Sequence, residues 1–103
     1  MTFQVARHDK FAKWLNRLRK KDRVLLAKAV KRLYQIEMGN FGDHGSVGGY
    51  VSELRIDYGP GYRLYYTLID TCAVFLLCAG DKSTQARDIK LAQKLAKEAR
   101  NGK

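Results

Sequence analysis

A hairpin between residues 53 and 66 constrains the fold of this chain more than any other stretch. Residues 53–57 and 62–67 each alternate between polar and apolar side chains, and a Gly-Pro-Gly turn separates the two runs. The alternation matches the two-residue period of a β-strand, so each run has one apolar and one polar face. Together with the turn, it predicts a β-hairpin. Arg55 and Arg63 then lie on neighbouring strands, on one wall of a sheet.

Helical periodicity accounts for the chain before and after the hairpin. Apolar residues recur at three- and four-residue spacing in three segments, as expected for helices that each bury one face. Asp9 and Asp22 are of a residue type that caps helix N-termini, and Ser83 or Thr84 can cap the last helix. The expected helices cover residues 10–21, residues 23–38 and a last segment that runs to residue 100.

The remaining segments are expected to be strands and one loop. Residues 2–7 alternate as the hairpin arms do, whereas residues 72–79 are apolar on both faces, which is typical of a central strand. Residues 41–49 contain four glycines, and this composition predicts a mobile loop. The hairpin strands are expected at residues 50–57 and 62–68.

This order of elements, β-α-α-β-β-β-α, predicts an α+β fold. Hairpin connections imply an antiparallel sheet, and the two N-terminal helices and the C-terminal helix are expected to pack on one face of it. The other face then carries Arg55 and Arg63. The length of 103 residues predicts a single domain spanning residues 1–103. The sequence has no run of 18 apolar residues and no charged-then-apolar leader, so we expect a cytoplasmic protein without a membrane-spanning segment.

Basic residues are distributed unevenly along the chain, which has a net charge of +10. Residues 7–32 hold eleven Lys and Arg against two acids, and residues 82–103 hold seven against two. Residues 33–81 contain six acids, so Arg55 and Arg63 stand out from an acidic background. Such a charge pattern indicates a polyanionic partner, such as nucleic acid, the ribosome, an acidic protein or an anionic membrane. The alternative is a solvated surface that only keeps the protein in solution.

The cysteines and histidines show no disulfide or metal-binding pattern. Cys72 and Cys78 are six residues apart in one expected strand, which separates them by about 20 Å and excludes a disulfide between them. Their equal parity places them on the same face, so two buried thiols are expected. His8 and His44 lack the spacing of metal ligands, and no metal or other cofactor is expected.

Residues 80–85, Gly-Asp-Lys-Ser-Thr-Gln, join the strand at residues 72–79 to the last helix. Lysine, hydroxyl groups and free backbone amides at a helix N-terminus can hold phosphate. The segment lacks the glycine spacing of a P-loop, which argues against nucleotide hydrolysis. If the strands are adjacent, side chains from separate segments converge on one phosphodiester. These side chains are Arg55, Arg63, Lys82, Gln85 and, near the start of the helix, Asp88.

Such a cluster suits RNA cleavage, because fixed guanidinium and ammonium groups stabilise the charge of a pentacoordinate phosphate. When the ribose 2′-hydroxyl attacks its own phosphodiester, the protein needs only to position the reacting groups, deprotonate the hydroxyl and neutralise the charge on the phosphate. No histidine is well placed as the base, and Asp88, Asp81 and Glu53 are the candidates. Glu53 is also interpretable as a cross-strand partner of Arg55 or Arg63, and Asp88 as a carboxylate favoured by the helix dipole.

Three stretches of the sequence resemble the RelE/ParE toxin superfamily, and most of all its HigB-like, addiction module killer branch. They are Glu-Leu-Arg-Ile at residues 53–56, Gly-Tyr-Arg-Leu-Tyr-Tyr at residues 61–66 and Gly-Asp-Lys-Ser-Thr-Gln at residues 80–85. The resemblance covers nearly the whole chain, including the order of elements. The Gly-Tyr-Arg motif gains its specificity from being joined to the third stretch.

The resemblance implies the toxin of a type II toxin–antitoxin system. RelE-like members cut mRNA in the ribosomal A site without a metal, so the implied partners are the ribosome, mRNA and a neutralising antitoxin, a small DNA-binding protein. By position, Arg63 matches the arginine that contacts the scissile phosphate, and Lys82 matches a basic phosphate-stabilising residue. Arg55 falls near their strand lysines. Asp88 falls where some members carry a catalytic tyrosine, a departure that leaves the base unassigned.

Two other functions are compatible with the same resemblance and charge. ParE-like members inhibit DNA gyrase by binding it, which is a different class of function on the same fold. A basic RNA-binding module without toxicity is the third hypothesis.

Overall fold

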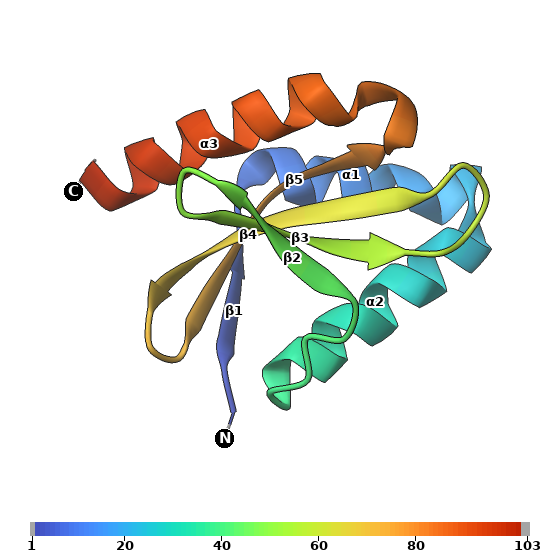
Figure 1. Ribbon diagram of the computed structural model, residues 1–103. Coiled ribbons are helices and arrows are strands. Elements are labelled where there is room, and N and C mark those ends of the chain that lie inside the picture. Colours follow the sequence, from blue (N-terminus) through green and yellow to red (C-terminus); the bar gives the residue numbers. More distant parts are fainter. Residues whose placement is uncertain (1, 102–103) are drawn as a thin grey trace.

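Two hydrophobic cores lie on opposite faces of a five-stranded sheet in the computed structural model, which describes residues 2–101 (Figure 1). Strands and helices follow one another in the order β1 (Gln4–Arg7), α1 (Asp9–Lys21), α2 (Arg23–Glu37), β2 (His44–Gly48), β3 (Val51–Ile56), β4 (Tyr62–Asp70), β5 (Ala73–Asp81), a 3-10 turn η1 (Lys82–Thr84) and α3 (Gln85–Asn101). The fold is therefore α+β.

The sheet is mixed, with the strand order β1-β5-β4-β3-β2. Strands β2 to β5 form antiparallel neighbours, whereas β1 lies parallel to β5. The expectation of a wholly antiparallel sheet is wrong at the β1 edge, because no hairpin joins β1 to its neighbour β5: two helices and three strands lie between them in the sequence. β5 is an interior strand, as its two apolar faces indicate, but β4 and not β5 is the middle strand.

Strand β2 replaces most of the mobile loop that was expected at residues 41–49, so the chain has one strand more than its composition indicates. Gly45 pairs with Glu53 of β3. A Cβ atom at Gly45 would lie 2.7 Å from Nη2 of Arg55. Glycine at this position thus allows a guanidinium group to lie against a strand, and it does not signal mobility.

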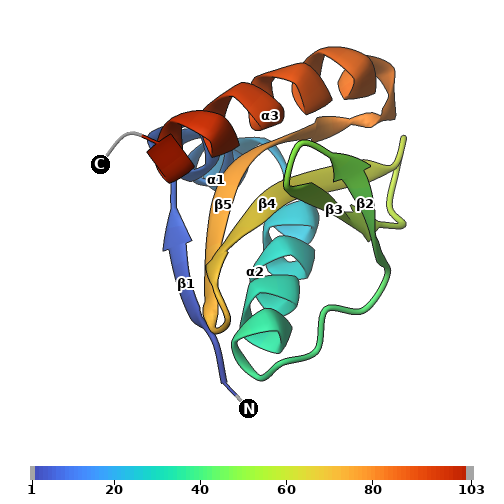
Figure 2. The same ribbon diagram turned by 60° about the vertical axis from the view of Figure 1, so that its left-hand side comes forward.

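The helices cover both faces of the sheet, and the expectation that all of them pack on one face is wrong. Helices α1 and α2 lie on one side and α3 lies on the other (Figures 1 and 2). Under α3 the sheet is apolar, with Tyr65, Leu77 and Cys78 packed against Ala92 and Leu95. The open polar surface is therefore confined to the end of the sheet that carries the arginines.

Each helix buries only one of its sides. The buried residues are Phe11, Leu15 and Leu18 in α1, Leu25, Ala29, Leu33 and Ile36 in α2, and Asp88, Ala92, Leu95 and Ala96 in α3. Between residues 2 and 101, no helix has the length and apolar character needed to cross a bilayer.

Of the expected helix caps, Asp22 is confirmed and Asp9 is wrong. Asp22 begins α2 as predicted, and its Oδ1 accepts a hydrogen bond from the Leu25 amide at 3.0 Å. Helix α1 is capped by His8, whose Nδ1 accepts from the Lys10 amide at 3.0 Å, so Asp9 is the first helical residue and not the cap. The 3-10 turn before α3 is capped by Asp81 rather than by a hydroxyl residue.

We expect Asp22→Ala to lower the free energy of unfolding by about 1–2 kcal/mol, because the cap is lost. The same substitution also removes the acceptor of the Tyr58 hydroxyl, which lies 3.1 Å from Asp22 Oδ1. The matched variant Asp9→Ala should change stability by no more than about 0.5 kcal/mol. Urea denaturation followed by circular dichroism measures both. Equal losses in the two variants would contradict these cap assignments.

Candidate functional site

Cross-strand pairing places the candidate residues in two rows on one face of the sheet. Arg55 of β3 pairs with Arg63 of β4, which pairs in turn with Gly80 of β5. In the next row on the same face, Glu53 pairs with Tyr65. Because alternate residues of a strand share a face, the two arginines lie side by side, as the hairpin pattern predicts.

The carboxylate of Glu53 is the centre of this arrangement, and the residue is only 4% exposed. Its Oε2 lies 3.0 Å from Arg55 Nε, and its Oε1 lies 3.4 Å from Arg63 Nε. The side-chain amide of Gln85 donates to the same Oε1 at 3.3 Å. A buried carboxylate is costly unless it is paired, so these contacts hold three side chains around one charge. Glu53 is therefore the ion-pair partner of both arginines, with Arg55 on its own strand β3 and Arg63 on the neighbouring strand β4.

Arg55 has a second acidic partner, since its Nη1 lies 2.7 Å from Asp43 Oδ1. The hydrogen bond with Asp43 raises the pKa of Arg55 above its ordinary value. Arg63, in contrast, shares the single carboxylate of Glu53 with Arg55. Within residues 2–101, Lys82 is exposed and forms no ion pair. Lys82 is thus the cation of this group whose charge is least compensated.

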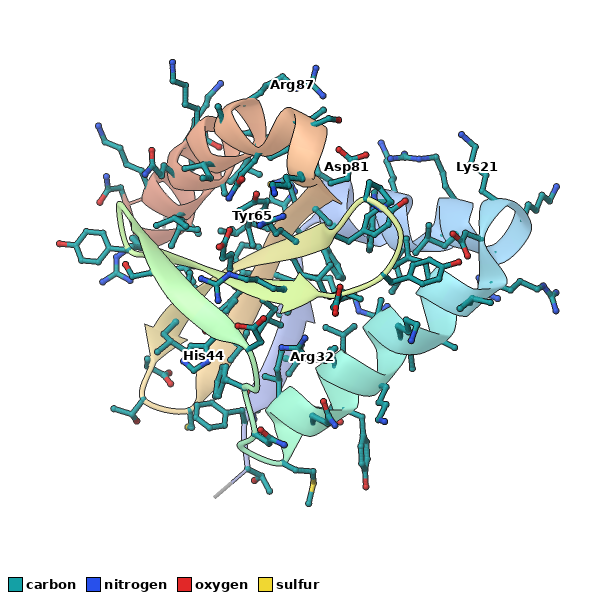
Figure 3. All side chains as sticks on the ribbon, turned by 45° about the vertical axis from the view of Figure 1, so that its right-hand side comes forward. Lys21, Arg32, His44, Tyr65, Asp81 and Arg87 are labelled. Atoms are coloured by element: carbon teal, nitrogen blue, oxygen red, sulfur yellow. The ribbon has the colours of Figure 1, made fainter. Side chains whose placement is uncertain are left out.

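A cavity of about 380 Å³ lies at the β3–β4 turn, and we call it the hairpin cavity. Its lining residues are Asp43, Arg55, Ile56, Asp57, Gly59, Pro60, Gly61, Tyr62, Arg63 and Lys82. The backbone amide of Lys82 donates to the carbonyl of Gly61 at 2.9 Å, which fixes the start of η1 against the turn. Figure 3 shows Asp81, the preceding residue, beside this turn. Cations from β3, β4 and η1 therefore meet at one cavity.

Asp88 and Gln85, the other two candidates, do not line the hairpin cavity. Asp88 lies in the first turn of α3 and is buried, and its Oδ2 accepts a hydrogen bond from Thr84 Oγ1 at 2.5 Å. A Cβ atom at Gly80 would lie only 2.0 Å from that oxygen, so the absent side chain of Gly80 leaves the space that Asp88 occupies. Gln85 reaches the site through Glu53 only.

Tyr65 is a residue of this site that the sequence pattern did not single out. Its side chain is fully buried, and its hydroxyl has no hydrogen-bond partner among the described residues. Burial, together with the nearby charges of Glu53 and Asp88, raises the pKa of Tyr65 well above its ordinary value, so the phenol stays neutral. Figure 3 shows Tyr65 beneath α3. The sequence offered one sign that Tyr65 belongs to the site: strand alternation places it between Arg63 and Thr67, on the same face of β4.

Arg32 is a second residue that the sequence did not reveal, because it belongs to a long basic helical stretch. Its guanidinium group donates to the carbonyls of Phe41 at 2.9 Å and Asp43 at 3.1 Å, and also to the carbonyl of Arg55. In Figure 3 it lies between α2 and the sheet. Burial lowers the pKa of Arg32 from its ordinary value. This side chain holds the segment that presents Asp43 to Arg55.

Among the candidate bases, Glu53 alone contacts both arginines. Hydrogen bonds from the hydroxyl and amide of Ser83 lower the pKa of Asp81 and make it a weaker base. Asp88 faces Thr84 and Gly80, away from the hairpin cavity.

The two cysteines differ from the expectation of two buried thiols. Cys78 is buried, but Cys72 is exposed, because β5 begins only at Ala73 and leaves Cys72 in the preceding turn. Burial raises the pKa of Cys78 to about 12. Within the described part of the chain, no three His, Cys, Asp or Glu side chains form a group that could hold a metal ion.

Fold and site together define a small α+β protein in which a mixed sheet gathers two arginines and a lysine around a buried carboxylate. No known protein-family profile matches the sequence. The chain is 46% identical over 98 residues to a Haemophilus influenzae (strain Rd) protein described as an uncharacterized protein. The match covers 95% of this chain and 97% of that protein. The chain belongs to the same family as this Haemophilus influenzae protein.

Tyr65→Phe is expected to leave the free energy of unfolding within about 0.5 kcal/mol of the wild type or to raise it, since it removes a buried hydroxyl that has no partner. Tyr58→Phe is the matched control, because the Tyr58 hydroxyl donates to Asp22. This control should be destabilised. Thermal and urea unfolding of both variants provide the measurement, and a marked loss of stability in Tyr65→Phe would show that its hydroxyl has a partner.

The native protein should present one reactive thiol. We expect an aromatic disulfide reagent at pH 8 to modify Cys72 rapidly, whereas Cys78 reacts only after denaturation, because it is buried and remains protonated far above neutral pH. Cys72→Ser should abolish the rapid phase. Two rapid phases in the folded protein would disprove the burial of Cys78.

Proposed function

We propose that this protein is the toxin of a type II toxin–antitoxin system, a HigB-like member of the RelE/ParE superfamily that cuts mRNA on the ribosome in the cytoplasm. The resemblance of residues 53–56, 61–66 and 80–85 to that superfamily supports the proposal. The observation that carries it is the meeting of Arg55, Arg63 and Lys82 at the hairpin cavity.

The cations of the hairpin cavity suit a phosphodiester. Arg55 is hydrogen-bonded to Glu53 and Asp43, and Arg63 lies at ion-pair distance from Glu53, so the guanidinium group of Arg55 in particular is oriented before any substrate arrives. In the proposed reaction they bind the non-bridging oxygens and stabilise the added negative charge of the pentacoordinate phosphate. Lys82 neutralises charge on the departing oxygen, since its ammonium group is exposed and not engaged by a carboxylate of the described chain.

Glu53 is the general base in this proposal, in place of Asp88. A phosphate that binds Arg55 and Arg63 takes over part of their pairing and leaves a carboxylate oxygen of Glu53 able to accept the proton of the ribose 2′-hydroxyl. The 2′-oxygen then bonds to phosphorus while the bond from phosphorus to the 5′-oxygen breaks, and the departing 5′-oxygen takes a proton from water. The products are a 2′,3′-cyclic phosphate and a 5′-hydroxyl. Asp88 supports the start of α3 through Thr84.

The proposed partners follow from the same reasoning. The ribosome and its mRNA are polyanions, which suits the basic segments at residues 7–32 and 82–103. The neutralising antitoxin is a small DNA-binding protein, by resemblance to the superfamily. The proposed activity requires no cofactor.

Lys82→Ala is the sharpest test of this function. We expect it to reduce codon-phased cleavage of a reporter mRNA in a cell-free translation system by about 100-fold, as measured by mapping the 5′ ends of the fragments. Thermal stability should not change, because Lys82 forms no ion pair within residues 2–101. Lys20→Ala, on the exposed side of α1, is the matched control. It also removes one lysine charge from a basic segment but leaves the hairpin cavity intact, so it should reduce cleavage far less than Lys82→Ala does.

Arg63→Ala should lose cleavage and also stability, because Glu53 then keeps one ion-pair partner fewer. Absence of ribosome-dependent cuts with the wild-type protein, together with undiminished toxicity of Lys82→Ala, would refute the nuclease proposal. A supercoiling assay with purified gyrase then decides whether the protein acts as a ParE-like inhibitor.

A further inference from the structure

A second basic surface lies along α3, at the end of the helix farther from Lys82. Lys90, Lys94, Lys97 and Arg100 are exposed and follow one another at helical spacing, so they form a row on the outer side of the helix. The β2–β3 turn lies beside the C-terminal half of α3 (Figures 1 and 2). This turn brings an aromatic side chain, Tyr50, to the basic row.

Tyr50 occupies a backbone conformation that is unfavourable for its residue type. Its φ angle is +65°, and it follows two glycines that also have positive φ, Gly48 and Gly49. Strained backbone of this kind persists only where the surroundings impose it, and it gathers at functional positions. Here the Thr67 hydroxyl donates to the Tyr50 carbonyl at 2.7 Å. The residue is nevertheless 74% exposed, so burial of its ring does not offset the strain.

The ring of Tyr50 is held in place by α3. The guanidinium carbon of Arg100 lies 4.1 Å from the ring centroid, and Arg100 Nη1 donates to the carbonyl of Leu68 at 3.1 Å. Gln93 fixes the turn itself, because its side-chain amide donates to the carbonyl of Val47 at 3.1 Å. An exposed aromatic ring therefore lies beside α3, with the guanidinium group of Arg100 over it.

A cavity of about 630 Å³ adjoins this ring, and its lining residues are Gly49, Tyr50, Gln93, Lys97, Arg100 and Asn101. The cavity combines a flat aromatic surface, amide groups and two cations, and none of its lining residues within residues 2–101 carries a carboxylate side chain. An aromatic platform for a base beside cations for the phosphates is the combination by which proteins hold single-stranded nucleic acid. An acidic peptide would use the cations but has no need of a strained, exposed ring.

We propose that Tyr50, Lys97 and Arg100 form a second binding site, the Tyr50 site, which holds a single-stranded RNA segment outside the hairpin cavity. One base stacks on Tyr50, and the adjoining phosphates contact Lys97 and the basic row of α3. The choice of RNA over other single strands rests on the proposed function. The site itself rests on the geometry of Tyr50 and α3.

The first test measures binding of a fluorescein-labelled 12-nucleotide oligouridylate by anisotropy. We expect Tyr50→Asn to weaken binding about tenfold or more, because asparagine tolerates positive φ but offers no ring on which a base can stack. Tyr50→Phe keeps the ring and should bind as the wild type does. Lys97→Ala should reduce the slope of log affinity against log salt by about 1. Circular dichroism verifies that each variant is folded.

The second test locates the contact with the same oligonucleotide carrying 5-iodouridine. Photo-crosslinks mapped by mass spectrometry should fall on Tyr50. Wild-type affinity of folded Tyr50→Asn, with crosslinks elsewhere, would overturn the inference. So would a Tyr50-dependent affinity for an acidic peptide without any effect on RNA binding.

Lys82→Ala separates this inference from the proposed function. It should abolish mRNA cutting while the crosslink to Tyr50 remains. If the wild-type protein cuts no mRNA but the crosslink persists, the nuclease proposal fails and the Tyr50 site stands. If the protein cuts mRNA but Tyr50 neither binds nor crosslinks, the Tyr50 site fails alone.

Discussion

The buried carboxylate of Glu53 is the charge on which the rest of this site depends. Burying a carboxylate in a position that is only 4% exposed is costly unless the group is paired, so this arrangement requires the guanidinium groups that surround it. Arg55 and Arg63 come from two strands and Gln85 comes from α3. One charge thereby couples the sheet to the helix and sets the directions of both arginines. It also means that changes at either arginine alter folding and ligand binding together.

The placement of helices on both faces of the sheet explains why the end of the sheet that carries the arginines is left uncovered. Helix α3 covers the apolar part of their face, over Tyr65 and Cys78, and the start of η1 is hydrogen-bonded to Gly61 in the β3–β4 turn. On the opposite face, α1 and α2 cover the larger core. The polar end of the sheet is therefore the part that no helix covers once the helices have packed on the apolar parts of both faces. In this fold the position of the site follows from the positions of the cores.

Local patterns predicted every helix and strand except β2, and the faces of the hairpin, but not the features set by distant contacts. The alternation around Arg55 and Arg63 placed them side by side because strand parity is a local property. Within residues 41–49, residues 44–48 form strand β2 despite their glycines, and the Arg55 guanidinium group lies where a side chain at Gly45 would be. Periodicity shows that α3 has a buried side but not which face of the sheet receives it. The burial of Asp88 against Gly80 could not be predicted either, because it depends on which face of the sheet α3 packs against.

The hydrogen bond from the Lys82 amide to the Gly61 carbonyl has a consequence for the energetics of any anion that enters the hairpin cavity. It ties the two rims of the cavity together, while Glu53 and Asp43 hold the guanidinium groups. The cost of ordering this receptor is then met during folding, and an incoming ligand loses little conformational entropy on the protein side. Recognition of this kind is preorganised: electrostatic complementarity exists before contact and requires no lid to close.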